Sequence, residues 1–313
     1  MSLQHQKIRG VVPPLITPLK NREELDVVGL KRLIEYQLAG GVAGLFILGT
    51  TGEAPSLSYR LRREMTEKSC EIVAGRVPVL VGVTDTALEE AVEHSKFAKS
   101  AGATAVVSAA PYYFSVGQDE SCDYLLNLAD TAVLPLFAYN IPSCVNLSLS
   151  FETIERLTTH PNICGLKDSA GDLVAFRKLL ELRSVRPDWT IFMGYESLLA
   201  ESVLMGSDGA VPGGAVLHPR LFVDSFHAAE RRDQQEINRL QIDITRIGTL
   251  YSMIGSGASG YLRGLKAALE VLEICAGELA MPFRKVDGAG RAKVAEFVRT
   301  LGIEYLNPDA QNG

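Results

Sequence analysis

The stretch Ile163-Cys164-Gly165-Leu166-Lys167-Asp168-Ser169-Ala170-Gly171-Asp172 joins an apolar run to a lysine and then to residues that begin helices. The apolar run predicts a strand buried on both faces, with Lys167 at its carboxyl end. Asp168 or Ser169 can cap the following helix, and Asp172 suits its first turn. Loss of solvent at Lys167 favours the neutral amine, which can attack a ketone carbonyl and form a Schiff base. The alternative is a strand-end lysine that points to water or holds a carboxylate.

Similar short apolar runs alternate with amphipathic segments from the start of the chain. They lie at residues 11–16, 44–48, 78–82, 105–109, 135–139, 163–166, 190–193 and 209–211. Eight strand–helix units at this spacing favour parallel strands joined by crossover helices. We therefore predict an α/β fold, a closed (β/α)8 TIM barrel, with an open doubly wound sheet as the lesser alternative. No G-x-G-x-x-G follows the first run, which argues against a dinucleotide-binding fold.

The pattern changes after the eighth run. Residues 221–302 predict helices only, over 230–252, 261–274 and 289–301. We expect a catalytic barrel over residues 1–220 and a C-terminal helical domain over residues 221–313.

The composition of the 313 residues is that of an ordinary globular protein, with 47% hydrophobic and 22% charged residues. A net charge of -6 argues against nucleic-acid binding, and no apolar run is long enough to cross a membrane. Five scattered cysteines predict reduced thiols in the cytoplasm, and the scattered histidines give no metal-binding spacing.

Candidate site residues follow the predicted strands, because barrel enzymes hold their catalytic groups at the carboxyl ends of strands. The turn Gly49-Thr50-Thr51-Gly52-Glu53 can direct N–H groups and hydroxyls at a carboxylate or phosphate, or it can be a plain turn. Pro111-Tyr112-Tyr113 follows the fourth strand, and Tyr139 ends the fifth. A tyrosine at such a place is usually a packing residue, but a phenol near a Schiff-base lysine could move protons. Val211-Pro212-Gly213-Gly214, after the last strand, is a weaker candidate for a phosphate site.

These motifs together resemble the dihydrodipicolinate synthase / N-acetylneuraminate lyase family over nearly the whole chain. The signatures are the GTTGE turn, Tyr139-Asn140-Ile141-Pro142, and the lysine segment from Gly165 to Asp172. The resemblance implies a (β/α)8 barrel with a helical extension, a homotetramer built as a dimer of dimers, and no metal or organic cofactor. It also implies pyruvate or another 2-oxo acid as substrate, together with an aldehyde.

The resemblance also implies roles for individual residues. Lys167 forms the Schiff base, Tyr139 moves protons, and Thr51 holds the pyruvate carboxylate. Thr50 links Tyr139 to Tyr113, which reaches in from the neighbouring subunit. The carbonyls of two further residues line the lysine's site, namely Gly194 and Val211.

One position departs from the synthase pattern. Cys144 stands where those enzymes place the arginine that binds the carboxylate of aspartate semialdehyde, and a thiol cannot make that forked contact. Other side chains suit the hydroxyls of a sugar acid, namely Ser169, Glu196 and Ser197. We therefore expect a pyruvate-dependent lyase or aldolase that acts on a 2-oxo-3-deoxy sugar acid or a related 4-hydroxy-2-oxo acid. The alternatives are 4-hydroxy-tetrahydrodipicolinate synthase, a sugar-acid dehydratase, and a barrel that binds a 2-oxo acid without turnover.

Overall fold

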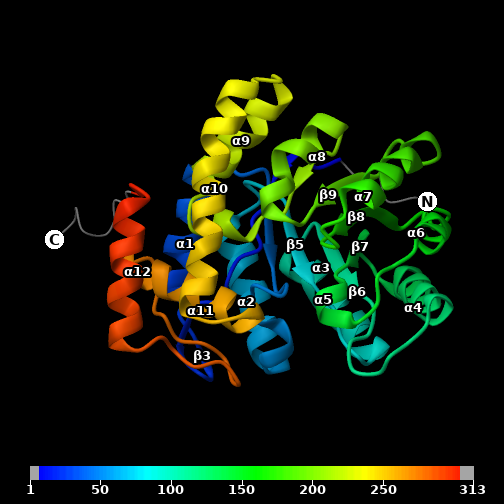
Figure 1. The fold of residues 1–313 in the computed structure, drawn as a ribbon. Coiled ribbons are helices and arrows are strands. Elements are labelled where there is room, and N and C mark those ends of the chain that lie inside the picture. Colours follow the sequence, from blue (N-terminus) through cyan, green and yellow to red (C-terminus); the bar gives the residue numbers. More distant parts are fainter. Residues whose placement is uncertain (1–6, 304–313) are drawn as a thin grey trace.

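The protein is described by a computed structural model that covers residues 7–303. Eight parallel strands form one sheet, and helices separate them along the chain (Figure 1). The order in the sheet is β1-β10-β9-β8-β7-β6-β5-β4. The strands are β1 (Gly10–Val11), β4 (Leu45–Ile47), β5 (Val79–Gly82), β6 (Ala105–Ala109), β7 (Leu136–Asn140), β8 (Ile163–Asp168), β9 (Thr190–Met193) and β10 (Gly209–Ala210).

The sheet closes on itself through the segment that follows β1. Pro14 forms a parallel bridge with Phe46 of β4, and Leu15 N donates to Phe46 O at 2.7 Å. On the other side, Gly10 and Val11 pair with Gly209 and Ala210 of β10. The predicted (β/α)8 barrel is thus confirmed, and the open sheet is not observed.

Eight helices cover the strands. They are α1 (Val27–Ala39), α2 (Tyr59–Val73), α3 (Leu88–Ala101), α4 (Gln118–Thr131), α6 (Phe151–Leu157), α7 (Leu173–Leu179), α8 (Leu199–Met205) and α9 (Pro219–Glu230). A four-residue helix, α5 (Pro142–Val145), follows β7. A hairpin of β2 (Leu19–Asn21) and β3 (Glu24–Leu25) precedes α1, and the sequence pattern did not predict it because both strands are short and partly exposed.

Apolar side chains fill the barrel below the strand ends. One buried cluster comes from inward-facing strand residues, including Phe46, Leu80, Val107, Phe137 and Phe192. The rings of Phe137 and Phe192 stack with their centres 5.9 Å apart. A packed interior of this kind leaves the carboxyl ends of the strands as the place for a ligand.

Three helices follow the barrel and lie together beside it, α10 (Gln234–Ile254), α11 (Gly257–Val271) and α12 (Gly288–Thr300) (Figure 1). The sequence predicted one helix over residues 230–252, but the chain breaks after Glu230. Asp233 caps α10 because its side chain accepts a hydrogen bond from Glu236 N. In residues 7–303, no helix is long and apolar enough to cross a membrane.

Strand β8 extends one residue beyond Lys167, the predicted end of the strand. Asp168 still pairs with Asn140 of β7, and Asn140 Nδ2 donates to Asp168 Oδ1 at 2.6 Å. The prediction that Asp168 or Ser169 caps the next helix was wrong. Asp172 is the cap of α7, and its carboxylate accepts from Val174 N and Ala175 N. Lys167 therefore lies within the paired end of the strand, held on both sides by β7 and β9.

Candidate active site

Lys167 lies at the carboxyl end of β8 with 5% of its surface exposed. Its Nζ atom is 3.5 Å from the centre of the Tyr139 ring and 5.7 Å from the centre of the Phe46 ring. Burial lowers the pKa of Lys167 to about 7, although negative charge at Cys144 and Asp168 acts to raise it. A large fraction of this amine is therefore neutral, and nucleophilic, near neutral pH.

Ser169 joins the lysine to Tyr139. Lys167 Nζ donates to Ser169 Oγ at 3.3 Å, and Ser169 Oγ donates to the Tyr139 hydroxyl at 3.4 Å. The parallel register places Tyr139 directly beside Lys167 on the neighbouring strand. Burial raises the pKa of Tyr139 well above its ordinary value, while hydrogen bonds with Ser169 and Thr50 oppose that rise. The phenol is thus neutral and lies in a chain of hydroxyl groups.

The GTTGE turn is fixed from outside the barrel by a buried ion pair. Glu53 Oε1 lies 2.6 Å from Lys266 Nζ on α11, and both side chains are fully buried. Glu53 Oε2 accepts from Ala280 N at 2.9 Å, and Lys266 Nζ also donates to Glu278 O at 2.6 Å. These bonds tie the turn that carries Thr50 and Thr51 to α11 and to the segment that follows it.

Thr51 is buried and faces another residue of α11. Its Oγ1 atom lies 2.8 Å from the Tyr261 hydroxyl. The Tyr261 ring packs edge-on against Tyr251 of α10, with ring centres 4.8 Å apart. Gly213 makes this approach possible, because a Cβ at that position would lie 2.0 Å from the Tyr261 hydroxyl.

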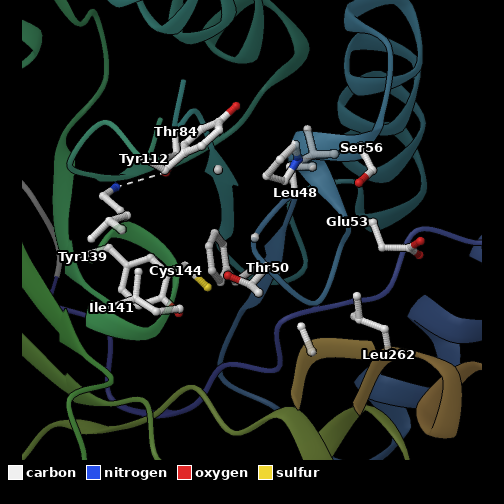
Figure 2. A pocket seen from close by; sticks show the side chains of 18 of the residues that line it. Leu48, Thr50, Glu53, Ser56, Thr84, Tyr112, Tyr139, Ile141, Cys144 and Leu262 are labelled. Atoms are coloured by element: carbon white, nitrogen blue, oxygen red, sulfur yellow. Dashed lines mark hydrogen bonds between the residues drawn. The ribbon is translucent and has the colours of Figure 1, made fainter. Parts of the chain in front are cut away.

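A first cavity of about 290 Å³ opens beside Tyr139. Figure 2 shows Thr50, Tyr139 and Cys144 on its walls, together with Glu53 and Leu262. Most of the other wall residues are apolar, and within residues 7–303 none of the lining residues is an arginine or lysine. The wall includes Cys144 of α5, so the position where a synthase would carry its arginine does face this cavity.

A second cavity of about 470 Å³ lies over the ends of β9 and β10. Its wall is rich in hydroxyl and carboxyl groups, from Glu196, Ser197, Thr245, Tyr251 and Tyr261. Gly194 and Gly213 also line this cavity. Again, no lining residue within the described part of the chain is an arginine or lysine.

Glu196 is bound within the wall of this second cavity. Its Oε2 atom accepts from Gly214 N and from the Tyr251 hydroxyl, the latter at 3.4 Å. Burial raises the pKa of Glu196, while the hydrogen bonds from Gly214 N and the Tyr251 hydroxyl act in the opposite direction. Gly214 N is therefore occupied by a side chain, and Tyr261 fills the space at Gly213. The structure therefore leaves no space for a phosphate at the Val211–Gly214 turn, which was the weaker candidate from the sequence.

Other predicted residues lie at the ends of neighbouring strands. Gly194 N donates to Asp168 O at 2.6 Å, and the buried Val211 N donates to Met193 O at 2.8 Å. Tyr113 behaves differently, because it is 78% exposed and contacts the Phe114 ring at 5.1 Å between centres. Tyr112 lines the first cavity instead. A single chain thus brings together Lys167, Tyr139, Thr50 and Ser169 but not Tyr113.

The sequence pattern did not predict the contribution of the last helices. Tyr251, Tyr261 and Lys266 are each more than eighty residues beyond Lys167, and no local motif marks them. Their regular spacing identified helices, but only the packing of α10 and α11 on the barrel shows that they reach the site. Within residues 7–303, no group of three or more His, Cys, Asp or Glu side chains could hold a metal ion.

Comparison with known proteins agrees with the fold and the motifs. A sequence model of the dihydrodipicolinate synthetase family matches residues 7–301. A probable 2-dehydro-3-deoxy-D-pentonate aldolase from Escherichia coli K12 is 32% identical over 79% of this chain and 83% of its own length. An N-acetylneuraminate lyase from Citrobacter koseri is 30% identical over 90% of this chain and 92% of its own. A solved dihydrodipicolinate synthase from Bacteroides thetaiotaomicron is 42% identical, with a TM-score of 0.90, and covers 94% of this chain and 100% of its own.

Proposed function

The chain belongs to the dihydrodipicolinate synthetase family of pyruvate-dependent Schiff-base lyases and aldolases, and on that premise we propose that it cleaves or forms a hydroxylated 2-oxo-3-deoxy acid. Cys144 is the observation that carries the choice of substrate class. It faces the first cavity where a synthase would need a guanidinium, and neither cavity has a basic lining residue within residues 7–303. A second substrate carboxylate would therefore lack a charged partner.

The second cavity supports the same choice. Its hydroxyl-bearing residues Ser197, Thr245 and Tyr251 offer donors and acceptors for a polyhydroxylated chain. Glu196 can contribute carboxylate acceptors to the same wall for the hydroxyl groups of that chain. We take this cavity as the place of the hydroxylated part of the substrate.

The proposed reaction begins at Lys167. The neutral amine attacks the ketone carbon of the 2-oxo acid, and loss of water gives a protonated imine. In the cleavage direction, Tyr139 takes the proton of the C4 hydroxyl and passes its own proton along the Ser169 or Thr50 hydroxyl. The electrons of the C3–C4 bond move into the imine, and an aldehyde leaves. The resulting enamine takes a proton at C3 back from this hydroxyl chain, and water then hydrolyses the imine to pyruvate and the free Lys167 amine. Addition of pyruvate to an aldehyde follows the same steps in reverse.

Other roles extend the proposal. Thr51 would hold the 2-oxo acid carboxylate, and Gly194 and Val211 would line the lysine's site through their carbonyls. Exposed Tyr113 would act in the site of a neighbouring subunit, within a homotetramer of paired dimers. We also propose a cytoplasmic location.

The synthase remains the second candidate, because a solved structure described as a dihydrodipicolinate synthase shares 42% of its residues with this chain.

The decisive experiment is a screen of 2-oxo-3-deoxy acids with coupled detection of pyruvate. Pyruvate and aspartate semialdehyde are run beside it with the same enzyme preparation. We expect turnover of at least one hydroxylated acid and weak synthase activity. A kcat/KM for aspartate semialdehyde above ~10⁴ M⁻¹s⁻¹, the low end of ordinary enzymes, would replace this assignment with the synthase.

A further inference from the structure

The hydroxyl of Tyr261 lies where α11 meets the GTTGE turn. It is 2.8 Å from Thr51 Oγ1, and Tyr261 also borders the second cavity with Gly194 and Gly213. The contact joins residues 210 positions apart in the chain, one on the barrel and one on the added helices. Thr51 is the residue that the proposed function assigns to the carboxylate of the 2-oxo acid.

A pair of hydroxyl groups at this distance has one hydrogen bond within the pair and one hydrogen to spare. If Tyr261 donates to Thr51, the threonine O–H is free to donate to an anion. If Thr51 donates to Tyr261, the phenol O–H has that freedom. Burial raises the pKa of Tyr261 above its ordinary value, so the phenol keeps its proton in either arrangement. The pair therefore presents one O–H donor whichever way its internal bond is directed.

The surrounding contacts hold Tyr261 in this position. The Tyr251 ring packs against one side of it, and Tyr251 in turn donates to Glu196. Gly213 leaves just enough space for the hydroxyl, since any Cβ there would overlap it. Five residues further along α11, the buried Lys266–Glu53 pair fixes the helix to the same turn that carries Thr51. A donor held on both sides in this way is preorganised and loses little side-chain freedom when a ligand binds.

We infer that Tyr261 is a positioning residue for the carboxylate of the 2-oxo acid and acts through its hydroxyl pair with Thr51. The inference rests on the proposed function, because it assumes that a 2-oxo acid carboxylate binds at Thr51. It adds that the C-terminal helices contribute directly to recognition of the 2-oxo acid, apart from any contact with the aldehyde half. Loss of the phenol hydroxyl should weaken binding of the carboxylate without changing the reactivity of Lys167.

The test compares the parent with Tyr261→Phe, in which only the hydroxyl is lost. Imine formation is trapped with cyanoborohydride over a range of ligand concentrations and measured by mass spectrometry. Pyruvate and methyl pyruvate are the two ligands, since the ester keeps the ketone but has no carboxylate. We expect the half-saturating pyruvate concentration to rise about 10-fold, because Thr51 loses the hydrogen bond that orients its hydroxyl, with less than 2-fold change for methyl pyruvate.

Tyr36→Phe is the matched control, because its hydroxyl donates to Leu217 O at 2.9 Å on the outside of the barrel. This variant should bind both ligands as the parent does. Two more proteins, Thr51→Val and the double variant Thr51→Val/Tyr261→Phe, complete a double-mutant cycle. The half-saturating pyruvate concentration of the double variant should be little higher than that of Thr51→Val. Equal losses for pyruvate and methyl pyruvate, no loss for pyruvate, or additive effects would each overturn the inference. If the parent forms no imine with pyruvate on Lys167, the proposed function itself fails, and the two failures are thus distinguishable.

Discussion

The lowered pKa of Lys167 predicts that imine formation depends on pH around neutrality. The pKa is about 7, against 10.5 for an exposed lysine, so about half of the amine is neutral at pH 7. An ordinary lysine would be neutral in only about 1 molecule in 3,000 at that pH. The neutral form increases as the pH rises, so the initial rate of imine formation with pyruvate should rise between about pH 6 and pH 8 and then level off.

A charge change at position 144 tests the physical cause of this behaviour. A negative charge at position 144 acts on Lys167 in the direction of a higher pKa, so a carboxylate at this position should raise the pKa of the lysine. In Cys144→Asp, the midpoint of the rate profile should move upward by about one pH unit or more. The Asn side chain of Cys144→Asn has nearly the same shape as Asp but no charge. This variant should leave the midpoint of the rate profile near pH 7.

The assay is the initial rate of cyanoborohydride-trapped adduct, followed by mass spectrometry of the peptide that carries Lys167 at each pH. A Lys167→Ala protein provides the background. A midpoint above pH 9 in the parent would show that burial does not favour the neutral amine, and the reasoning would fail. Equal midpoints for the Asp and Asn variants would show that position 144 does not act on the lysine electrostatically.

Three further outcomes are expected. Cys144→Arg should raise kcat/KM with aspartate semialdehyde relative to the parent, because it restores a forked donor; an unchanged value would remove Cys144 from the specificity argument. Lys266→Met should lower the free energy of unfolding by about 3–5 kcal/mol in denaturant titrations, since it leaves Glu53 buried and unpaired, and Glu53→Gln in the same chain should recover part of that loss. If Tyr113 acts between subunits, mixing Tyr113→Phe and Lys167→Ala proteins should restore activity; no recovery after proven subunit exchange would contradict this.

The sequence predicted the parts of the fold that depend on local pattern. The apolar run before Lys167 identified a buried strand, and the alternation of eight such runs with amphipathic segments predicted the barrel. The helix cap after Lys167 was misplaced because Asn140, on a neighbouring strand, extends β8 through Asp168. Strand pairing of this kind is tertiary and leaves no mark in the local residues.

The candidate site was predictable only where motifs mark it. Tyr139, Thr50 and Ser169 belong to recognisable segments, and the structure places them near Lys167. Tyr261 lies on an amphipathic helix, where a tyrosine is usually a packing residue. Its contact with Thr51 depends on how α11 lies on the barrel, which neither periodicity nor spacing encodes.

The close approach of Tyr261 to Gly213 also limits how this chain can evolve. A side chain at 213 cannot appear while the phenol hydroxyl occupies that space, and a smaller residue at 261 would leave an unfilled gap beside Thr51. A side chain at position 213 therefore requires a change at position 261. Homologous barrels that place a bulkier residue after the last strand should carry a smaller one on the helix, and that covariation would separate groups of enzymes with different ligand pockets from one another.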